Sequence, residues 1–226
     1  IASFSIDNNQ KLEIDRLMAL RGPDDCQVFQ RNNIFLKHFR LITRGSGERG
    51  KQPMIGERYI LLFNGNIINS SALARKYFIN DSESDTEVLA NLIEKYGPKI
   101  ISELNGFFAI VIFDTFYNEW TLARDRLGIK PLFFSQELDS LSFASRADVL
   151  AKLLQKNINK EKLLSTLKYG SVFMNETIYD NVEQVAPGEI IRWKRNKFIS
   201  KEVYWSVDDQ LSKKKEKNKQ DEINYL

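Results

Sequence analysis

Few residue types in this chain could do chemistry, and the most informative is an Asn-Gly pair. The stretch FNGNIIN, residues 63–69, places Asn64 and Gly65 between two short apolar arms. Asn-Gly in that setting is the strongest short signal for a β-hairpin turn, because both residues tolerate positive φ. The same pair also carries hydrogen-bond donors. The stretch alone is therefore compatible with a turn or with donors that face a substrate.

The single histidine and the single cysteine limit the nucleophilic chemistry inside the chain. A Ser-His-Asp or Cys-His hydrolase would have to use His38, but a lone histidine in a strand is more often structural than a base. Cys26 alone excludes an internal disulfide and a cysteine-cluster zinc site, and it fits a reducing compartment. We therefore expect no metal site and a structural His38.

Arg40 lies in NIFLKHFRLI, residues 33–42, which is predicted to be a strand. Two-residue alternation places the following residues on one face of it: Ile34, Leu36, His38, Arg40 and Ile42. An arginine among apolar neighbours needs a carboxylate partner, and its planar guanidinium suits a bidentate one. The partner is either an internal acid or the carboxylate of a ligand.

Two stacked sheets are the elements expected to position these residues. The continuous apolar runs 59–63 and 107–113 predict strands that are covered on both faces. Further strands are predicted at 1–6, 25–30, 33–42, 119–124, 132–136, 141–145, 189–193 and 198–205, and helices at 71–78, 84–97, 147–156 and 159–170. Short turns between the strands indicate antiparallel pairing, and doubly covered strands need neighbours on each side, so the sheets should be flanked by helices.

Composition indicates a soluble protein with a substantial core. The chain has 226 residues, of which 42% are hydrophobic, and no stretch approaches the length of a membrane span. Its N-terminus lacks the features of a signal peptide, so we expect a cytoplasmic protein. The net charge is +3, and the lysine-rich run at 213–219 alone contributes +4, from five lysines and one glutamate. The remainder is nearly neutral, which predicts no nucleic-acid partner.

Ten short motifs, taken in order, resemble the glutaminase domain of asparagine synthetases. They are RGPDD (21–25), HFRL (38–41), QPM (52–54), FNGNIIN (63–69), SDTEV (84–88), LNGFFA (104–109), LARDRLGIKPLFF (122–134), FAS (143–145), APGE (186–189) and YW (204–205). Each motif alone is weak, but all ten in the family's order are highly specific. The resemblance implies an α+β class II glutamine amidotransferase domain with the four-layer αββα sandwich of N-terminal-nucleophile hydrolases.

The resemblance also implies a role for individual residues. In the family, the thiolate of an N-terminal cysteine attacks the side-chain amide of L-glutamine, and the α-amine of that cysteine is the base. Asn64 and Gly65 match the oxyanion hole, and Asp85 matches the carboxylate that takes the α-ammonium of glutamine. Arg40 matches the clamp on the α-carboxylate. The other substrate-binding positions are Leu41, Ile42, Thr43, Arg44 and Asn66.

The chain also departs from the family pattern. The family begins Met-Cys-Gly-Ile, whereas this chain begins at Ile1, so we expect the catalytic cysteine just upstream. Cys26 cannot replace it, since it has no α-amine. Leu20 stands where the family usually has histidine, and Arg146 where it usually has glutamate. Asn66 replaces the usual glutamate after Asn-Gly, which alters the expected ammonium site.

The expected organisation is an amidotransferase type 2 domain over residues 1–208. Residues 209–226 would form a lysine-rich linker and the start of an ATP-dependent synthetase domain, with QDEINYL opening a helix. That second domain is the expected partner and the place for ATP and Mg²⁺, because this chain has no glycine-rich phosphate loop and should need no cofactor of its own. A homodimer is left open. The charged segment 123–131 is expected to be structural or to face the next domain.

Two functions from different classes remain. The first is an enzyme domain that releases ammonia for an ATP-activated carboxylate, that of aspartate, or for a sugar or peptide acceptor. The second is a non-catalytic relic of the same fold that acts as a scaffold. Joint retention of Arg40, Asn64, Gly65 and Asp85 favours the enzyme.

Overall fold

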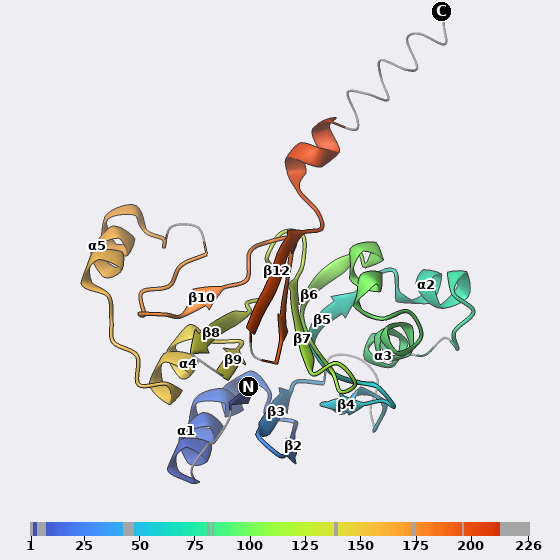
Figure 1. The fold of residues 1–226 in the computed structure, drawn as a ribbon, viewed down its shortest axis with the longest axis horizontal. Helices are drawn as coiled ribbons and strands as arrows, with labels where there is room; N and C mark the ends of the chain where they lie inside the picture. The colour runs from blue at the N-terminus through green and yellow to red at the C-terminus, as the bar shows by residue number, and fades with distance from the viewer. Residues whose placement is uncertain are drawn as a thin grey trace, which may run out of the picture.

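Two six-stranded antiparallel sheets form the centre of the molecule (Figure 1). The computed structural model describes residues 2–3, 8–42, 48–80, 82, 84–137, 140–172, 175–195 and 197–212. The first sheet has the order β10 (Glu183–Gln184), β8 (Phe133–Glu137), β9 (Ser140–Ala144), β1 (Ala2–Ser3), β3 (Ile34–Arg40) and β2 (Asp25–Arg31). The second has the order β12 (Lys197–Val203), β11 (Glu189–Lys194), β7 (Glu119–Arg124), β6 (Gly106–Asp114), β5 (Tyr59–Ile67) and β4 (Met54–Ile55).

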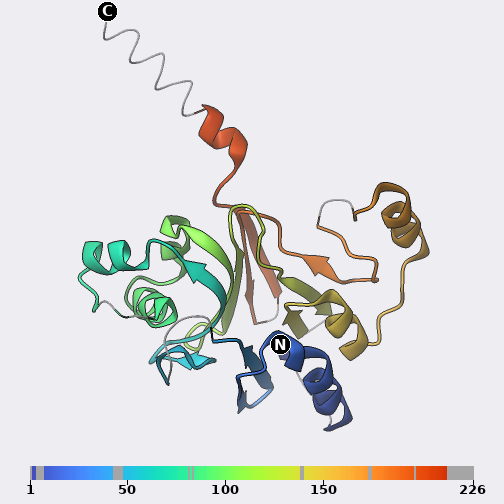
Figure 2. The same ribbon diagram turned by 180° about the vertical axis from the view of Figure 1, so that it is seen from behind.

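Helices cover the outer face of each sheet, which gives the expected αββα layers (Figures 1 and 2). Helices α2 (Ser70–Lys76) and α3 (Asp85–Tyr96) pack on the second sheet, and α1 (Asn8–Met18) and α4 (Ala147–Leu153) pack on the first. Helix α5 (Lys160–Tyr169) has no buried residue and lies to the side in Figure 1. The 3-10 turns are η1 (Ala19–Arg21), η2 (Glu48–Gly50) and η3 (Pro98–Glu103). Ser84 caps the N-terminus of α3, because its hydroxyl accepts a hydrogen bond from the Glu87 N–H.

Three hydrophobic clusters fill the three interfaces between these layers. One packs α2 and α3 against β5 and β6 through residues such as Leu61, Phe63 and Leu89. A second lies between the sheets and contains Leu62 and Phe143. The third packs α1 and α4 against the first sheet. Alternate residues of β5 enter different clusters, so this strand is covered on both faces, as its continuous apolar run predicts.

The Asn-Gly pair is not a hairpin turn. Asn64 and Gly65 lie inside β5 and pair with Ala109 and Phe108 of β6. The connection from β5 to β6 instead runs through α2 and α3. The hairpin interpretation is therefore wrong, because pairing along a long central strand overrides the local turn propensity.

Several short elements lie outside the sequence-based predictions. Helix α1 and the two-residue strands β4 and β10 were not expected. Two of the short turns expected between strands are confirmed, at Asn32 between β2 and β3 and at Asn118 between β6 and β7, and both residues have positive φ. The expected helix in QDEINYL, residues 220–226, lies outside the described residues.

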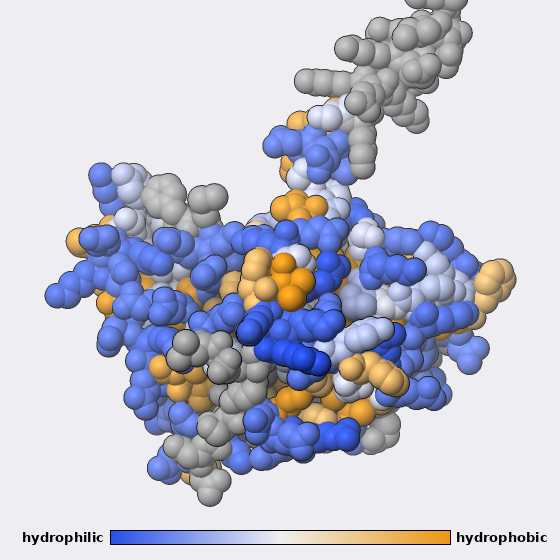
Figure 3. All heavy atoms as spheres, in the orientation of Figure 1, coloured by the Kyte–Doolittle hydropathy of each residue, from blue (hydrophilic) through white to orange (hydrophobic). Residues whose placement is uncertain are grey.

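The second sheet ends in an exposed edge strand, β12, from which the chain leaves the body of the domain. Phe198, Ile199 and Val203 are each more than half exposed, and hydrophobic surface lies near β12 in Figure 3. A short helix at 207–212 follows and projects away from the sheets (Figure 1). None of the described helices combines the length and hydropathy needed to cross a membrane.

Candidate active site

A cavity of about 300 Å³ lies at one end of the layer between the two sheets. Its apolar floor includes Leu62, Val111, Leu132 and Phe143, which belong to the hydrophobic cluster between the sheets. Its rim comes from the end of β3, the end of β5 and the start of α3. The cavity is therefore where the apolar inter-sheet layer opens and polar side chains replace the core.

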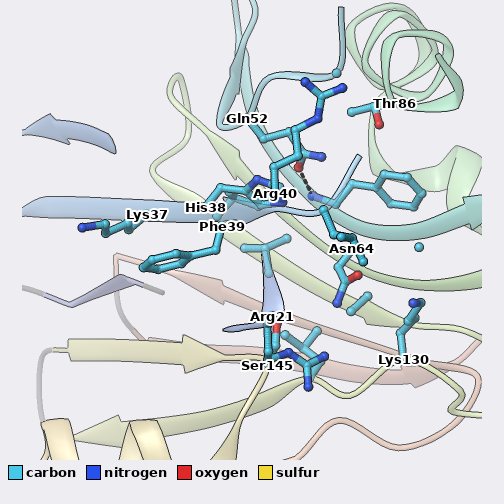
Figure 4. Close-up of a pocket in the computed structure, with 18 of the residues that line it drawn as sticks. Arg21, Lys37, His38, Phe39, Arg40, Gln52, Asn64, Thr86, Lys130 and Ser145 are labelled. Carbon is cyan, nitrogen blue, oxygen red and sulfur yellow. Dashed lines mark hydrogen bonds between the residues drawn. The ribbon is translucent and has the colours of Figure 1, made fainter. Parts of the chain in front are cut away.

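Strand β5 presents its Asn64 side chain to this cavity by simple alternation. Ile60 and Leu62 point between the sheets, whereas Leu61 and Phe63 point to α3. Side chains two residues apart share a face, so Asn64 follows Leu62 towards the inter-sheet side. Asn64 lines the cavity, and in Figure 4 it lies between Gln52 and Lys130.

The free edge of β5 presents the N–H of Gly65 to the same cavity. Phe63 N donates to Gln52 Oε1 over 2.5 Å, and Ile67 N donates to Asp85 Oδ2 over 2.8 Å. Backbone N–H groups two residues apart in a strand point to the same edge. The N–H of Gly65 therefore lies between two occupied donors and faces the opening, because Gly65 itself lines the cavity.

Close approach of β6 requires glycine at position 65. An added Cβ would lie 2.1 Å from the carbonyl oxygen of Phe107 and 2.7 Å from Cα of Phe108. Both neighbours are backbone atoms that cannot rotate away. A side chain here would force β5 and β6 apart and would move the Asn64 and Gly65 donors.

Arg40 and Asp85 bring opposite charges to the rim. Arg40 ends β3, and its guanidinium packs against Gly50, where an added Cβ would lie 2.4 Å from Nη2. Asp85 begins α3 and uses one carboxylate oxygen for the Ile67 N–H. Both side chains belong to the cavity lining. The arrangement can hold a small molecule that carries both a carboxylate and an ammonium group.

His38 lines the same cavity as a neutral group. Burial lowers the pKa of His38 to about 4, the charge of Arg40 acts in the same direction, and a hydrogen bond to the Phe63 backbone opposes both. At neutral pH the imidazole is therefore uncharged, and His38 adds no positive charge beside Arg40. His38 and Arg40 both line the cavity, as do their neighbours Lys37 and Phe39.

The charged segment 123–131 is mainly structural, as expected. Asp125 is fully buried and accepts hydrogen bonds from the N–H groups of Phe108, Leu127, Ile129 and Lys130. Arg124 donates to the carbonyl oxygens of Lys130, Val185 and Gly128. The exception is Lys130, which lines the cavity.

The cavity brings together every predicted site residue that the structure describes. These are Arg40, Leu41, Ile42, Asn64, Gly65, Asn66 and Asp85. Thr43 and Arg44 lie outside the described residues. The polar lining residues that sequence reasoning missed include Arg21, Gln52, Lys130 and Ser145. Each falls in a motif that was noticed (RGPDD, QPM, the charged segment and FAS), so membership of those motifs was the available signal.

The described part of the chain contains no cluster of metal-ligating side chains. No group of three or more His, Cys, Asp or Glu side chains there could hold a metal ion. Of the three residues that depart from the family pattern, Asn66 lines the cavity, whereas Leu20 and Arg146 do not. Leu20 is 91% exposed, and Arg146 donates to the Leu17 carbonyl and pairs with Asp148.

Comparison with known proteins identifies the family of this chain. The family model described as a glutamine amidotransferase domain matches residues 1–205. The chain is 27% identical over 215 residues to asparagine synthetase [glutamine-hydrolyzing] 3 of Bacillus subtilis, covering 89% of this chain and 35% of that protein. It is 34% identical over 131 residues to asparagine synthetase B of Escherichia coli, covering 56% and 24%.

A solved structure shares the fold. Glutamine phosphoribosylpyrophosphate amidotransferase from B. subtilis superposes with a TM-score of 0.54 at 22% identity, covering 77% of this chain and 36% of that one. The chain thus spans well under half the length of these proteins. The matched family model, the αββα layers and the cavity on β5 agree, and the chain belongs to the glutamine amidotransferase domain family.

Proposed function

We propose that this cavity binds L-glutamine and hydrolyses its side-chain amide, releasing ammonia for an ATP-dependent synthetase domain of the same protein. The observation that carries the proposal is the convergence of Arg40, Asp85 and the Asn64-Gly65 donors on one cavity. Glutamine is a zwitterion with a planar amide at its far end. Charges at the rim and amide-directed donors deeper in the site match those two ends.

The proposed chemistry uses the thiolate of a cysteine that precedes Ile1. The thiolate attacks the carbonyl carbon of the amide, and the oxyanion receives hydrogen bonds from the Asn64 side chain and the Gly65 N–H. The C–N bond then breaks, and ammonia leaves with a proton delivered by the cysteine α-amine. Water attacks the resulting thioester, which returns the thiol and yields glutamate.

The direction of β1 supports that location for the nucleophile. Ala2 pairs with Leu36 of β3 and with Phe143 of β9, antiparallel to both. Towards its N-terminal end, β1 therefore runs alongside the segments that lead to His38 and Ser145. Both of these residues line the cavity. A chain that continues upstream in this direction would deliver its first residues to the site.

The acceptor of the ammonia is proposed to be aspartate. This rests on the asparagine synthetases to which the chain is similar, and sugar or peptide acceptors are alternatives that the cavity does not distinguish. The further proposal is that residues 1–208 are the amidotransferase domain and that residues 209–226 lead into the synthetase domain. ATP and Mg²⁺ would act in that second domain.

Covalent labelling tests the proposed chemistry. Full-length protein treated with a diazo ketone analogue of glutamine should gain the mass of one adduct, mapped to an N-terminal cysteine. An excess of L-glutamine should slow the labelling, and Arg40→Ala should slow it as well. A protein that stays unmodified, or one labelled only at Cys26, would contradict the proposal and favour a non-catalytic scaffold.

A further inference from the structure

Strand β4 begins at Met54, although the same pairing with β5 could start two residues earlier in the chain. Met54 pairs with Leu61 and Ile55 pairs with Ile60. Extending that register by two residues would set Gln52 opposite Phe63. The intervening Pro53 has no N–H and cannot contribute a ladder hydrogen bond.

The side chain of Gln52 takes the place of the missing backbone partner. Gln52 is only 5% exposed, and its Oε1 accepts the hydrogen bond from the Phe63 N–H over 2.5 Å (Figure 4). A side-chain amide reaches further than a backbone carbonyl, so the main chain at residue 52 can stand away from β5. The space left at that edge belongs to the cavity, which both Gln52 and Gly65 line.

The Gly65 N–H depends on the two flanking contacts for its orientation. Phe63 is tied to Gln52 on one side, and Ile67 is tied to the Asp85 carboxylate on the other. Between these two points no β4 residue pairs with β5. Without the Gln52 contact, the segment of β5 that carries Asn64 and Gly65 would lose its support on the edge that faces the cavity.

We propose that Gln52 is a positioning residue that fixes the Phe63 peptide and thereby directs the Asn64 side chain and the Gly65 N–H into the cavity. Its effect on catalysis rests on the proposed glutaminase function, whereas its effect on the strand does not. Gln52 acts through Phe63 and need not touch glutamine. Its removal should therefore affect the reacting state more than substrate binding.

Two variants of Gln52 separate the hydrogen bond from the shape of the side chain. Gln52→Met keeps the length and removes the acceptor, whereas Gln52→Glu keeps both the length and an acceptor for Phe63. Gln136→Met is the matched control, because Gln136 also uses Oε1 as an acceptor, from Trp193 Nε1 over 2.7 Å, and does not line the cavity.

The experiment measures two quantities on full-length protein. Residue-resolved hydrogen–deuterium exchange by mass spectrometry with electron-transfer fragmentation reports on the Phe63 and Ile67 N–H groups. Steady-state glutaminase assays report kcat and KM. We expect Gln52→Met to speed exchange at Phe63 but not at Ile67, and to lower kcat about tenfold to hundredfold with KM within about twofold. Gln52→Glu should restore both readouts, and Gln136→Met should change neither.

Each result decides one part of the proposal. Unchanged exchange at Phe63 in a folded Gln52→Met protein would overturn the strand-positioning role. Faster exchange with unchanged kcat would overturn the link to catalysis. A loss of kcat that Gln52→Glu does not restore would overturn the hydrogen bond as its cause. If the wild-type protein has no glutaminase activity, the proposed function fails, and the exchange measurement still decides whether Gln52 holds β5.

Discussion

Two pairs of arginine and aspartate residues in this domain have different roles. One pair stabilises a loop, and the other lines the cavity. Arg124 and Asp125 are neighbours in sequence, are both buried, and direct their polar atoms to backbone groups of the surrounding loops. Arg40 and Asp85 come from different layers of the fold and meet at the rim of the cavity. The first pair holds the loop between β7 and β8, while the second can receive a ligand.

The comparison shows that the hydrogen bonds a charged side chain already makes within the fold predict its availability to a ligand better than the density of charge around it. Segment 123–131 is the most conspicuously charged motif near the site, yet both carboxylate oxygens of Asp125 are committed to N–H groups. Within the part of the chain that the structure describes, Asp85 gives only one oxygen to the backbone, at Ile67. A polar group that the fold has fully satisfied has little left to offer a substrate.

The largest expected effect is on stability, from Asp125→Ala. The substitution leaves four backbone N–H groups without their acceptor. The expected cost is about 4 kcal/mol of unfolding free energy, because the Phe108 hydrogen bond is buried, the other three are partly buried, and each lost acceptor costs about 1–3 kcal/mol where water cannot replace it. Urea denaturation measures it. The control is Asp148→Ala, a half-exposed partner of Arg146, which should cost less than about 1 kcal/mol. Equal losses for the two variants would contradict the structural role of Asp125.

Next in size is Asn64→Ala, which should affect catalysis and spare the fold. Losing one oxyanion donor raises the barrier by about 3–4 kcal/mol, so kcat should fall roughly 10²-fold to 10³-fold. The side chain faces the cavity, and the melting temperature should stay close to that of the wild type. Turnover within threefold of wild type, or a loss of activity that follows unfolding, would place Asn64 with Asp125 on the structural side.

The partly buried His38 should make the cavity wall sensitive to acid. Its folded pKa of about 4 lies below the ordinary value of about 6.5, so the folded state binds fewer protons between these values. The stability contributed by neutral His38 is fully present above about pH 6.5 and is lost as the pH falls towards 4, by up to about 3 kcal/mol. In denaturation measured across this range, His38→Gln should flatten the slope. An unchanged slope would rule out His38 as its source.

The smallest expected effect is at Asn66, beside the ammonium site. A neutral amide oxygen accepts a weaker hydrogen bond from an ammonium than a carboxylate does. Asn66→Glu should therefore lower the KM for glutamine about fivefold, which corresponds to about 1 kcal/mol, and should leave kcat within a small factor. Steady-state kinetics measure both constants. A higher KM or lost turnover would show that Asn66 serves the local geometry of β5.

The layers of the fold were predictable because a strand covered on both faces leaves a continuous apolar run in the local sequence. The runs 59–63 and 107–113 are apolar on both faces, and only a strand between two cores needs that pattern. Helix α1 was not predictable in the same way. Its sequence is mostly polar, and it buries chiefly Ile14 and Met18 against the third cluster.

The site was predictable in its residues but not in its construction. Asn64 and Gly65 looked like a turn because local propensity is all that a short window contains. Their actual setting depends on the pairing of β5 with β6 and on the short pairing of β4 with β5, which covers only Met54 and Ile55. Gln52 and Lys130 approach the cavity from separate loops, and no spacing rule in the sequence brings them together.

The central claim is that Arg40 and Asp85 recognise the two charges of glutamine, and one comparison tests it most directly. Asp85→Asn keeps an oxygen for the Ile67 N–H and removes the charge. Values of kcat/KM are measured for this variant and for wild type, with glutamine and with 4-carbamoylbutanoate, which lacks the α-ammonium. We expect Asp85→Asn to lower kcat/KM about tenfold or more for glutamine and by less than about threefold for the analogue. An equal loss for both substrates would contradict the assignment of Asp85 to the ammonium group.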